Sequence, residues 1–151
     1  MIMRVLRWAF GWGPTIAALL IVLGAWGAMH WPASWWLRNA VTFVHDAQVG
    51  APVFMDVERE IRRPFLAEWT VIVRRLENNG WSVACTAHGR GNYLPGAALP
   101  DPLTLEWWTD GQCSHPPPGR LYLTTIWRID GPTGKRPVVV TSNVFEVAAS
   151  P

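Results

Sequence analysis

Charge is missing from a long stretch near the start of this chain. No acidic residue precedes Asp46, and no residue between Arg7 and Arg38 carries a permanent charge. A helix needs about 20 apolar residues to cross the hydrocarbon layer of a bilayer, and a charge inside that layer is expensive. We therefore expect a transmembrane helix over residues 13–31, preceded by a short cytoplasmic stub at 1–12. In an alternative the helix starts near Val5 and contains Pro14.

The chain also lacks the motifs of several enzyme classes. It has no glycine-rich phosphate loop and no sequence that resembles a nucleophile elbow. Five carboxylates could supply an acid pair for glycoside hydrolysis, which needs two acids several ångströms apart. Three of them alternate along one expected strand between arginines, however, which is typical of a solvated face. We expect a non-enzymatic protein with no catalytic residue and no cofactor. The five carboxylates are Asp56, Glu58, Glu60, Glu68 and Glu106.

An excess of basic charge is missing as well. Of the 13 lysines and arginines, Arg4 and Arg7 precede the apolar segment, which leaves 11 basic residues against 11 acidic ones in the rest of the chain. A nucleic-acid-binding domain usually carries a basic patch. The near-neutral domain therefore indicates that nucleic acid is not a partner.

Positive charge beside a first membrane span is retained in the cytoplasm. Arg4 and Arg7 thus predict a cytoplasmic N-terminus and an exported C-terminal domain, which places the chain in the inner membrane of a bacterium with its domain in the periplasm. Trp35 and Trp36 fit anchors at the membrane interface. A cleavable signal peptide, cut after Gly27, is the rival interpretation.

Residues 32–51 are expected to form a juxtamembrane linker or a short interfacial helix. After Pro52 apolar and polar residues alternate with period two, which is typical of strands, and Asn78-Asn79-Gly80 indicates a hairpin turn. Six or seven such strands predict an antiparallel β-sandwich over residues 52–148. The side chains expected inside it are Val71, Val73, Val83, Leu105, Leu123 and Trp127.

Two segments of the expected sandwich carry a family resemblance. Pro118-Gly119-Arg120-Leu121-Tyr122-Leu123 is similar to the Pro-Gly-x-Tyr entry to the penultimate strand of immunoglobulin-like domains of bacterial and phage envelope proteins. Ser142-Asn143-Val144-Phe145-Glu146-Val147 is similar to their Ser-x-x-Phe-x-Val ending. The cysteine–tryptophan–cysteine arrangement of antibody domains is absent in its usual spacing. The whole layout resembles uncharacterised single-pass membrane-anchored proteins of proteobacteria and phages, and the resemblance implies an immunoglobulin-like β-sandwich.

Cys85 and Cys113 are the only cysteines. In an exported domain two cysteines favour a structural disulfide. An alternative adds His88 and His115, because zinc is bound tetrahedrally by two cysteines and two histidines, and copper could use the same four groups. We expect the disulfide and no metal.

Trp107 and Trp108 are adjacent, so on a strand they point to opposite faces and one of them leaves the core. The outward tryptophan is a candidate contact for a partner protein or a sugar ring. We therefore expect a protein-interaction or envelope-assembly module, whose partners are the lipid bilayer and an unidentified envelope protein. The alternatives are an exported metal-binding domain and a cell-wall-associated or phage lysis factor that contacts glycan.

Overall fold

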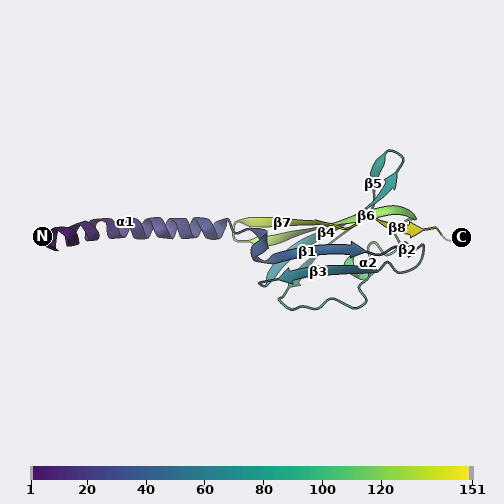
Figure 1. The fold of residues 1–151 in the computed structure, drawn as a ribbon, viewed down its shortest axis with the longest axis horizontal. Helices are drawn as coiled ribbons and strands as arrows, with labels where there is room; N and C mark the ends of the chain where they lie inside the picture. The colour runs from purple at the N-terminus through teal and green to yellow at the C-terminus, as the bar shows by residue number, and fades with distance from the viewer. Residues whose placement is uncertain (1, 150–151) are drawn as a thin grey trace. The chain divides into compact units, whose positions relative to one another are not determined.

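The computed structural model describes the backbone of residues 2–149 and the side chains of residues 13–27 and 29–149. The chain divides into two compact units, Met1–Pro32 with Gly131–Gly134, and Ala33–Asp130 with Lys135–Pro151. The first unit contains the long helix, and the second contains almost all of the β-structure (Figure 1).

Helix α1 runs over Ile2–Met29 and contains Pro14. The segment 1–12, expected as a stub, is therefore helical from Ile2 onward, as in the alternative that places Pro14 inside the helix. Met1 and the side chains of Arg4 and Arg7 lie outside the described residues. Within the part of the chain that the structure describes, we find no helix with both the length and the apolar character that a membrane span requires.

The second unit is mainly β, with eight strands among its described residues. The prediction of a linker or interfacial helix at 32–51 is wrong: after a short 3₁₀ turn, Ala33–Trp35, this segment forms β1 and β2 and starts the β-domain before residue 52. Trp36 is buried in that domain and is not a membrane anchor. The strands are β1 Leu37–Val44, β2 Ala47–Gln48, β3 Met55–Ile61, β4 Phe65–Glu77, β5 Gly80–Tyr93, β6 Gly119–Gly131, β7 Gly134–Thr141 and β8 Phe145–Ala148.

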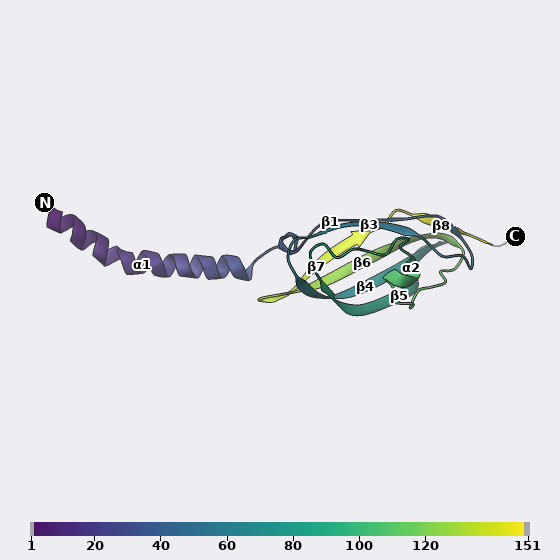
Figure 2. The ribbon, with the colours of Figure 1, turned by 90° about the horizontal axis from the view of Figure 1, so that it is seen from below.

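These strands form two sheets. β1 and β3 pair antiparallel in a two-stranded sheet, and the larger sheet has the order β2-β8-β6-β4-β5, with β7 also paired to β6. Figure 2 shows β4, β5 and β6 as neighbouring ribbons beside the β1–β3 pair. The prediction of antiparallel sheets is confirmed for these pairs, while β2 runs parallel to β8. The number of strands differs from the expected six or seven because β1 and β2 lie where a linker was expected, Leu105–Trp108 is helical, and the C-terminal segment forms two strands, β7 and β8.

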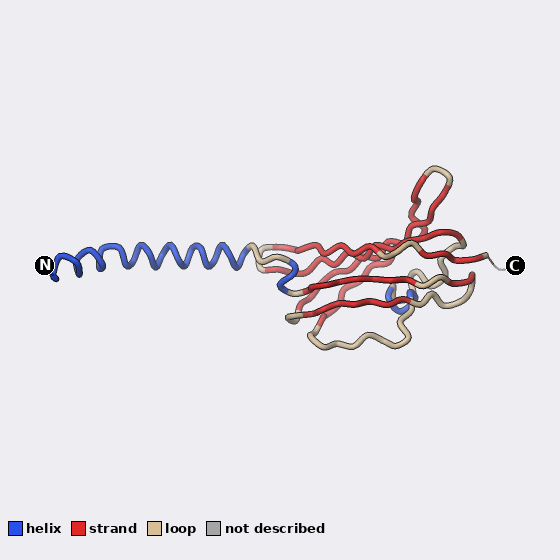
Figure 3. Tube along the Cα trace, in the orientation of Figure 1, coloured by secondary structure: helices blue, strands red, loops and turns tan. Residues whose placement is uncertain are grey.

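The hairpin expected at Asn78-Asn79-Gly80 is present, and β4 pairs with β5 along its whole length. Gly80 has a φ of 126°, a conformation that side-chain-bearing residues rarely adopt, so a glycine is needed there. The loop of this hairpin projects from the sheet in Figure 3. Strong turn chemistry and period-two alternation made this hairpin predictable from sequence.

The prediction for Val83 is wrong, because the side chain is 59% exposed. Val73 pairs with Cys85, but the next residue, Arg74, pairs with Val83. β5 therefore carries one extra residue at Ala84, and such a bulge puts the side chains before it, Val83 included, on the opposite face from the one that the alternation after it predicts. The other five expected core residues are buried.

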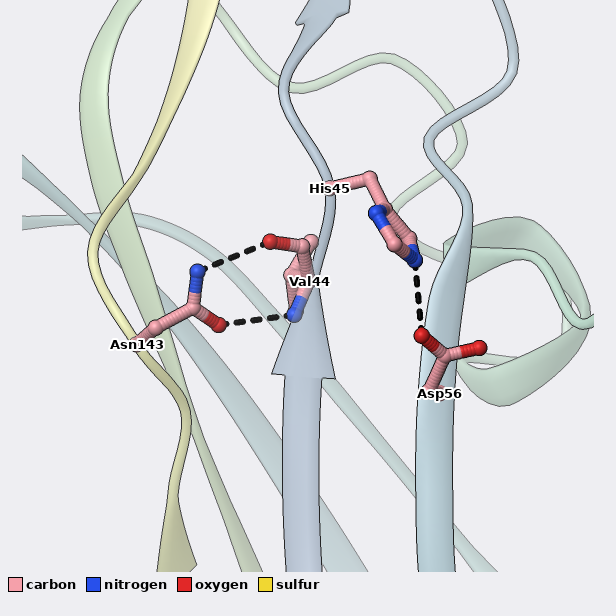
Figure 4. Close-up of polar contacts among 4 residues, drawn as sticks. All are labelled: Val44, His45, Asp56 and Asn143. Carbon is pink, nitrogen blue, oxygen red and sulfur yellow. Dashed lines mark hydrogen bonds and ion pairs between the residues drawn. The ribbon is translucent and has the colours of Figure 1, made fainter.

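The last expected strand is interrupted at Ser142-Asn143, so β7 and β8 are separate strands. The side-chain amide of Asn143 explains the break: its Oδ1 accepts from the Val44 N–H at 2.7 Å, and its Nδ2 donates to the Val44 C=O at 2.8 Å (Figure 4). The two hydrogen bonds join the β7–β8 connection to the end of β1. Beside them, His45 Nε2 lies 2.7 Å from Asp56 Oδ2.

Candidate functional site

The predicted disulfide between Cys85 and Cys113 is present, with the two Cα atoms 6.0 Å apart. Cys85 lies on β5, and Cys113 follows the short helix α2, Leu105–Trp108. The bridge therefore attaches the segment after α2 to the edge strand of the larger sheet. This separation is within the range that native disulfides span.

Leu105, Trp107 and Trp108 were expected on a strand, but they lie on helix α2. The Thr104 side chain accepts a hydrogen bond from the Trp107 N–H at 3.2 Å, which is an N-cap interaction. The buried Thr109 hydroxyl donates to the Leu105 C=O at 2.7 Å and closes the other end of the turn. The segment before α2 is held on the start of β3, because the Leu105 N–H donates to the Val53 C=O at 2.8 Å.

The two adjacent tryptophans do separate, although on a helix rather than a strand. Trp108 is buried, and its indole N–H donates to the Thr125 hydroxyl at 3.1 Å. Its ring meets that of Trp127 edge-on, with centroids 5.9 Å apart. Trp107 is 54% exposed. Trp107 is therefore the tryptophan of the pair that is available for contact.

Gln112 closes part of the free edge of β5. Its side-chain Nε2 donates to the His88 C=O at 2.9 Å, and its Oε1 accepts from the His88 N–H at 3.2 Å. A primary amide thus takes the place that a neighbouring strand would occupy. Together with the disulfide, it holds the α2 segment against the sheet.

A cavity of about 970 Å³ lies between α2, the loop that precedes it and the face of β4, β5 and β6. Figure 3 shows that long loop between β5 and α2. Arg59, Glu106 and Asp110 are among the charged residues that line the cavity. We call this cavity the aromatic cleft, after its five aromatic residues: Trp69, Tyr93, Trp107, Trp108 and Trp127.

Glycines on β5 make room for the floor of the aromatic cleft. Gly89 pairs with Trp69, and a Cβ at Gly89 would lie only 2.5 Å from the Trp69 ring. A Cβ at Gly91 would lie 3.2 Å from the ring of Tyr93. Every side chain other than glycine would displace the Trp69 indole, so Gly89 on β5 is what allows a tryptophan at the paired position of β4.

Tyr93, in the lining of the cleft, contacts both Phe65 and Trp127. Its ring stacks on Phe65 with centroids 4.8 Å apart, and its hydroxyl accepts a hydrogen bond from the Trp127 indole at 3.3 Å. Burial raises the pKa of the Tyr93 phenol, while the Trp127 hydrogen bond and the charge of Arg59 oppose this shift. The phenol is therefore neutral at pH 7 and keeps its proton to donate.

Arg59 extends from β3 into the same space. Its guanidinium carbon lies 5.4 Å from the centroid of Tyr93 and 5.9 Å from that of Trp108. Burial lowers the pKa of this guanidinium, which nevertheless stays charged at neutral pH because arginine is not deprotonated in proteins. Within the described residues no carboxylate forms an ion pair with Arg59.

The four residues of the alternative metal site do not form one. Zinc ligation by cysteine needs thiolates, and the sulfurs of Cys85 and Cys113 are joined to each other. Among the described residues there is no group of three or more histidine, cysteine, aspartate or glutamate side chains that could hold a metal. His88 and His115 are exposed.

Sequence reasoning found Trp107 and Trp108 but missed Arg59, Trp69 and Tyr93 as members of a site. These residues lie on β3, β4 and β5, and the register of three strands and α2 brings them together. Two signals were available in the sequence. A Gly-x-Gly pair inside a strand indicates the close approach of another group. Arg59 lies between Glu58 and Glu60, so on a strand its side chain points to the opposite face from these two carboxylates.

Comparison with known proteins shows no match to this chain among family models, curated proteins or solved structures.

Tyr93→Phe should make the free energy of unfolding less dependent on alkaline pH. In the unfolded chain a tyrosine loses its proton near pH 10, whereas the raised pKa of Tyr93 delays this loss in the folded state. The stabilisation is therefore fully present below pH ~10 and is lost as the pH rises through the folded pKa. At pH 7 the variant should be less stable by about 1 kcal/mol, because it lacks the hydrogen bond to Trp127.

Urea titrations of both proteins between about pH 8 and about pH 11 measure this difference. The gap between wild type and variant should shrink as the pH rises. A gap that stays constant over this range would show that the Tyr93 phenol titrates as it does in the unfolded chain.

Proposed function

We propose that this chain is a membrane-anchored, non-enzymatic binding protein, and that its β-domain uses the aromatic cleft to bind a component of the cell envelope. The observation that carries the binding role is the cleft itself, a cavity of about 970 Å³ with five aromatic residues in its lining. Ligand sites are concave, are lined largely by apolar and aromatic side chains, and contain a few polar groups that set specificity. Trp107 is the exposed aromatic at its rim.

The surface of α1 supports the anchoring role. Seven of its described large apolar side chains are more than half exposed and do not gather on one face. A helix that is apolar all round is normally covered by protein or lipid. Together with the charge-free sequence between Arg7 and Arg38, this favours lipid as the cover. These side chains are Ile16, Leu19, Leu20, Ile21, Val22, Leu23 and Trp26.

The orientation and the fold family are parts of the same proposal. Arg4 and Arg7 favour a cytoplasmic N-terminus and a β-domain in the periplasm, where the Cys85–Cys113 disulfide would be stable. An immunoglobulin-like relationship and a kinship with membrane-anchored proteins of proteobacteria and phages stay predictions from the two motifs. An envelope protein and a glycan are both candidate occupants of the cleft.

Reporter fusions test the orientation. Alkaline phosphatase fused after Val147 should be active, because it acquires its disulfides only after export, and a fluorescent protein that folds only in the cytoplasm should be dark at the same place. Intact mass measurement of the membrane fraction would show whether the chain is cut after Gly27. A bright fluorescent fusion with inactive phosphatase would overturn the orientation.

Photo-crosslinking tests the binding role. A benzophenone amino acid at Trp107 should give a covalent adduct in intact cells, because this side chain is exposed at the rim of the cleft. The matched control is Val139, which is also exposed but lies on β7 outside the cleft lining. Equal adducts at both positions, or none at Trp107, would contradict a binding role for the cleft. Digestion with a protease or a muramidase would identify the adduct as protein or glycan.

A further inference from the structure

The aromatic cleft contains a cation without a carboxylate partner. The Arg59 guanidinium is partly buried beside the rings of Tyr93 and Trp108, and the described residues provide it with neither an ion pair nor a hydrogen bond. Removing a charge from water costs free energy, and the faces of two rings offset only part of that cost. Arginine presents a planar fork of donors that matches a carboxylate.

Trp69 and Trp107 supply the aromatic surface that a ligand can reach, because the rings of Trp108 and Trp127 are buried. The N–H of Trp108 is used by Thr125, and the N–H of Trp127 is used by Tyr93. For a ligand this leaves the surface of Trp69 and Trp107, and polar groups that include the donors of Arg59, the Asn92 amide and the Tyr93 hydroxyl. A flat apolar face with hydrogen-bond acceptors around it is complementary to such a surface.

The cavity is also lined by Arg90, which pairs with Asp130 at 3.1 Å, by Asn92, and by two carboxylates. Glu106 and Asp110 line it, and neither forms an ion pair within the described part of the chain. Carboxylates accept hydrogen bonds from hydroxyl and amide groups. A ligand with one acidic group and several hydroxyls would therefore find a partner for each.

The edge of β5 argues against a bound peptide strand. Peptides commonly bind by adding a strand to a free sheet edge and using its backbone groups. At His88 both the N–H and the C=O are already taken by Gln112, and the disulfide holds the α2 segment beside that edge. A saccharide needs no backbone ladder, so the cleft suits it better.

We propose that the aromatic cleft binds a saccharide that bears a carboxylate, with its sugar ring against Trp69 and Trp107 and its carboxylate on Arg59. The cavity has room for a short oligosaccharide, since about 970 Å³ is at the upper end of ligand-site volumes. This inference rests on the proposed binding function and specifies the class of ligand for the same site.

Titration calorimetry on the full chain in detergent micelles tests the inference with two matched pairs of sugars. The pairs are N-acetylmuramic acid with N-acetylglucosamine, and glucuronic acid with glucose, which differ mainly in the carboxylate. The acidic member of each pair should bind about tenfold more tightly or better, because hydrogen bonds between charged groups are the strong ones. Arg59→Gln should abolish this preference while it preserves binding of the neutral sugar.

Arg59→Lys keeps the charge without the planar fork and should show an intermediate preference. Arg120→Gln is the matched control, because Arg120 is exposed on β6 and outside the cleft lining, and it should bind as the wild type does. If Arg59→Gln does not fold, Arg59→Lys takes its place, and a preference as strong as that of the wild type would then overturn the role of Arg59.

Equal affinities for acidic and neutral sugars, or a preference that survives in Arg59→Gln, would overturn the role of Arg59 but leave a sugar-binding cleft. Binding of neither kind of sugar would overturn the saccharide inference. In that case a protein adduct at Trp107 in the photo-crosslinking experiment would still support the proposed binding function, whereas its absence would remove both.

Discussion

Trp127→Ala should lower the free energy of unfolding by about 3–5 kcal/mol, as large-to-small changes in a core do. The ring is 1% exposed on β6, meets Trp108 edge-on, and donates its N–H to the Tyr93 hydroxyl. Alanine would leave a cavity beneath the aromatic cleft and remove the donor to Tyr93. Denaturant titration measures the change.

Two variants separate the contributions of this ring. Trp127→Phe keeps an aromatic ring in the core but lacks the N–H, so it should be less damaging than alanine. Trp107→Ala is the matched control at an exposed tryptophan and should change stability by less than about 1 kcal/mol. If Trp127→Ala also costs less than that, the inward face of β6 is assigned incorrectly.

Removal of the disulfide should have the second large effect. The cysteines are 28 positions apart, and closing a loop of this length removes unfolded-state entropy worth roughly 3.6 kcal/mol in the chain-entropy model. A small domain is stable by only about 5–15 kcal/mol, so the double variant Cys85→Ala/Cys113→Ala should unfold at clearly lower denaturant concentration. Reduced wild type should behave as the double variant does.

The bridge also has a local role, which hydrogen exchange can detect. Without it the α2 segment is held by side-chain contacts such as the Gln112 clamp on His88 and the Trp108 hydrogen bond to Thr125. Amides around α2 should then exchange faster than those of β4 and β6. Thiol labelling of unreduced, denatured protein should find no free cysteine. Two labelled thiols in the exported protein would show that the bridge does not form.

Local chemistry made part of the fold predictable. Asn78-Asn79-Gly80 specifies a tight turn, because Gly80 adopts a positive φ that few other residues tolerate. The alternation along β4 and β6 places Val71, Leu123 and Trp127 on the buried face. In these strands one face meets the core and the other meets solvent, so the pattern in the sequence and the structure agree.

Where both faces of a strand carry apolar residues, the pattern was misleading. On β1, Val44 is buried while Val41 and Phe43 are exposed, so apolar residues recur at a spacing that suggested a helix or linker. Around α2 the alternation of Leu105 and Trp107 suggested a strand, but the Thr104 cap and the burial of Trp108 produce a helical turn. The bulge at Ala84 in β5 placed the Val83 side chain on the solvent-exposed face instead of the buried one.

The β-class of the domain and the turn at Gly80 were predictable from the sequence, because each depends on residues that lie close together in the chain. The disulfide was predictable because the chain has two cysteines and therefore one possible pair. The aromatic cleft was not predictable in this way. Arg59, Trp69, Tyr93 and Trp127 come from four different strands, and their meeting depends on strand register and on the room that Gly89 leaves for an indole. Register is a property of paired strands, so a pattern within one strand does not contain it.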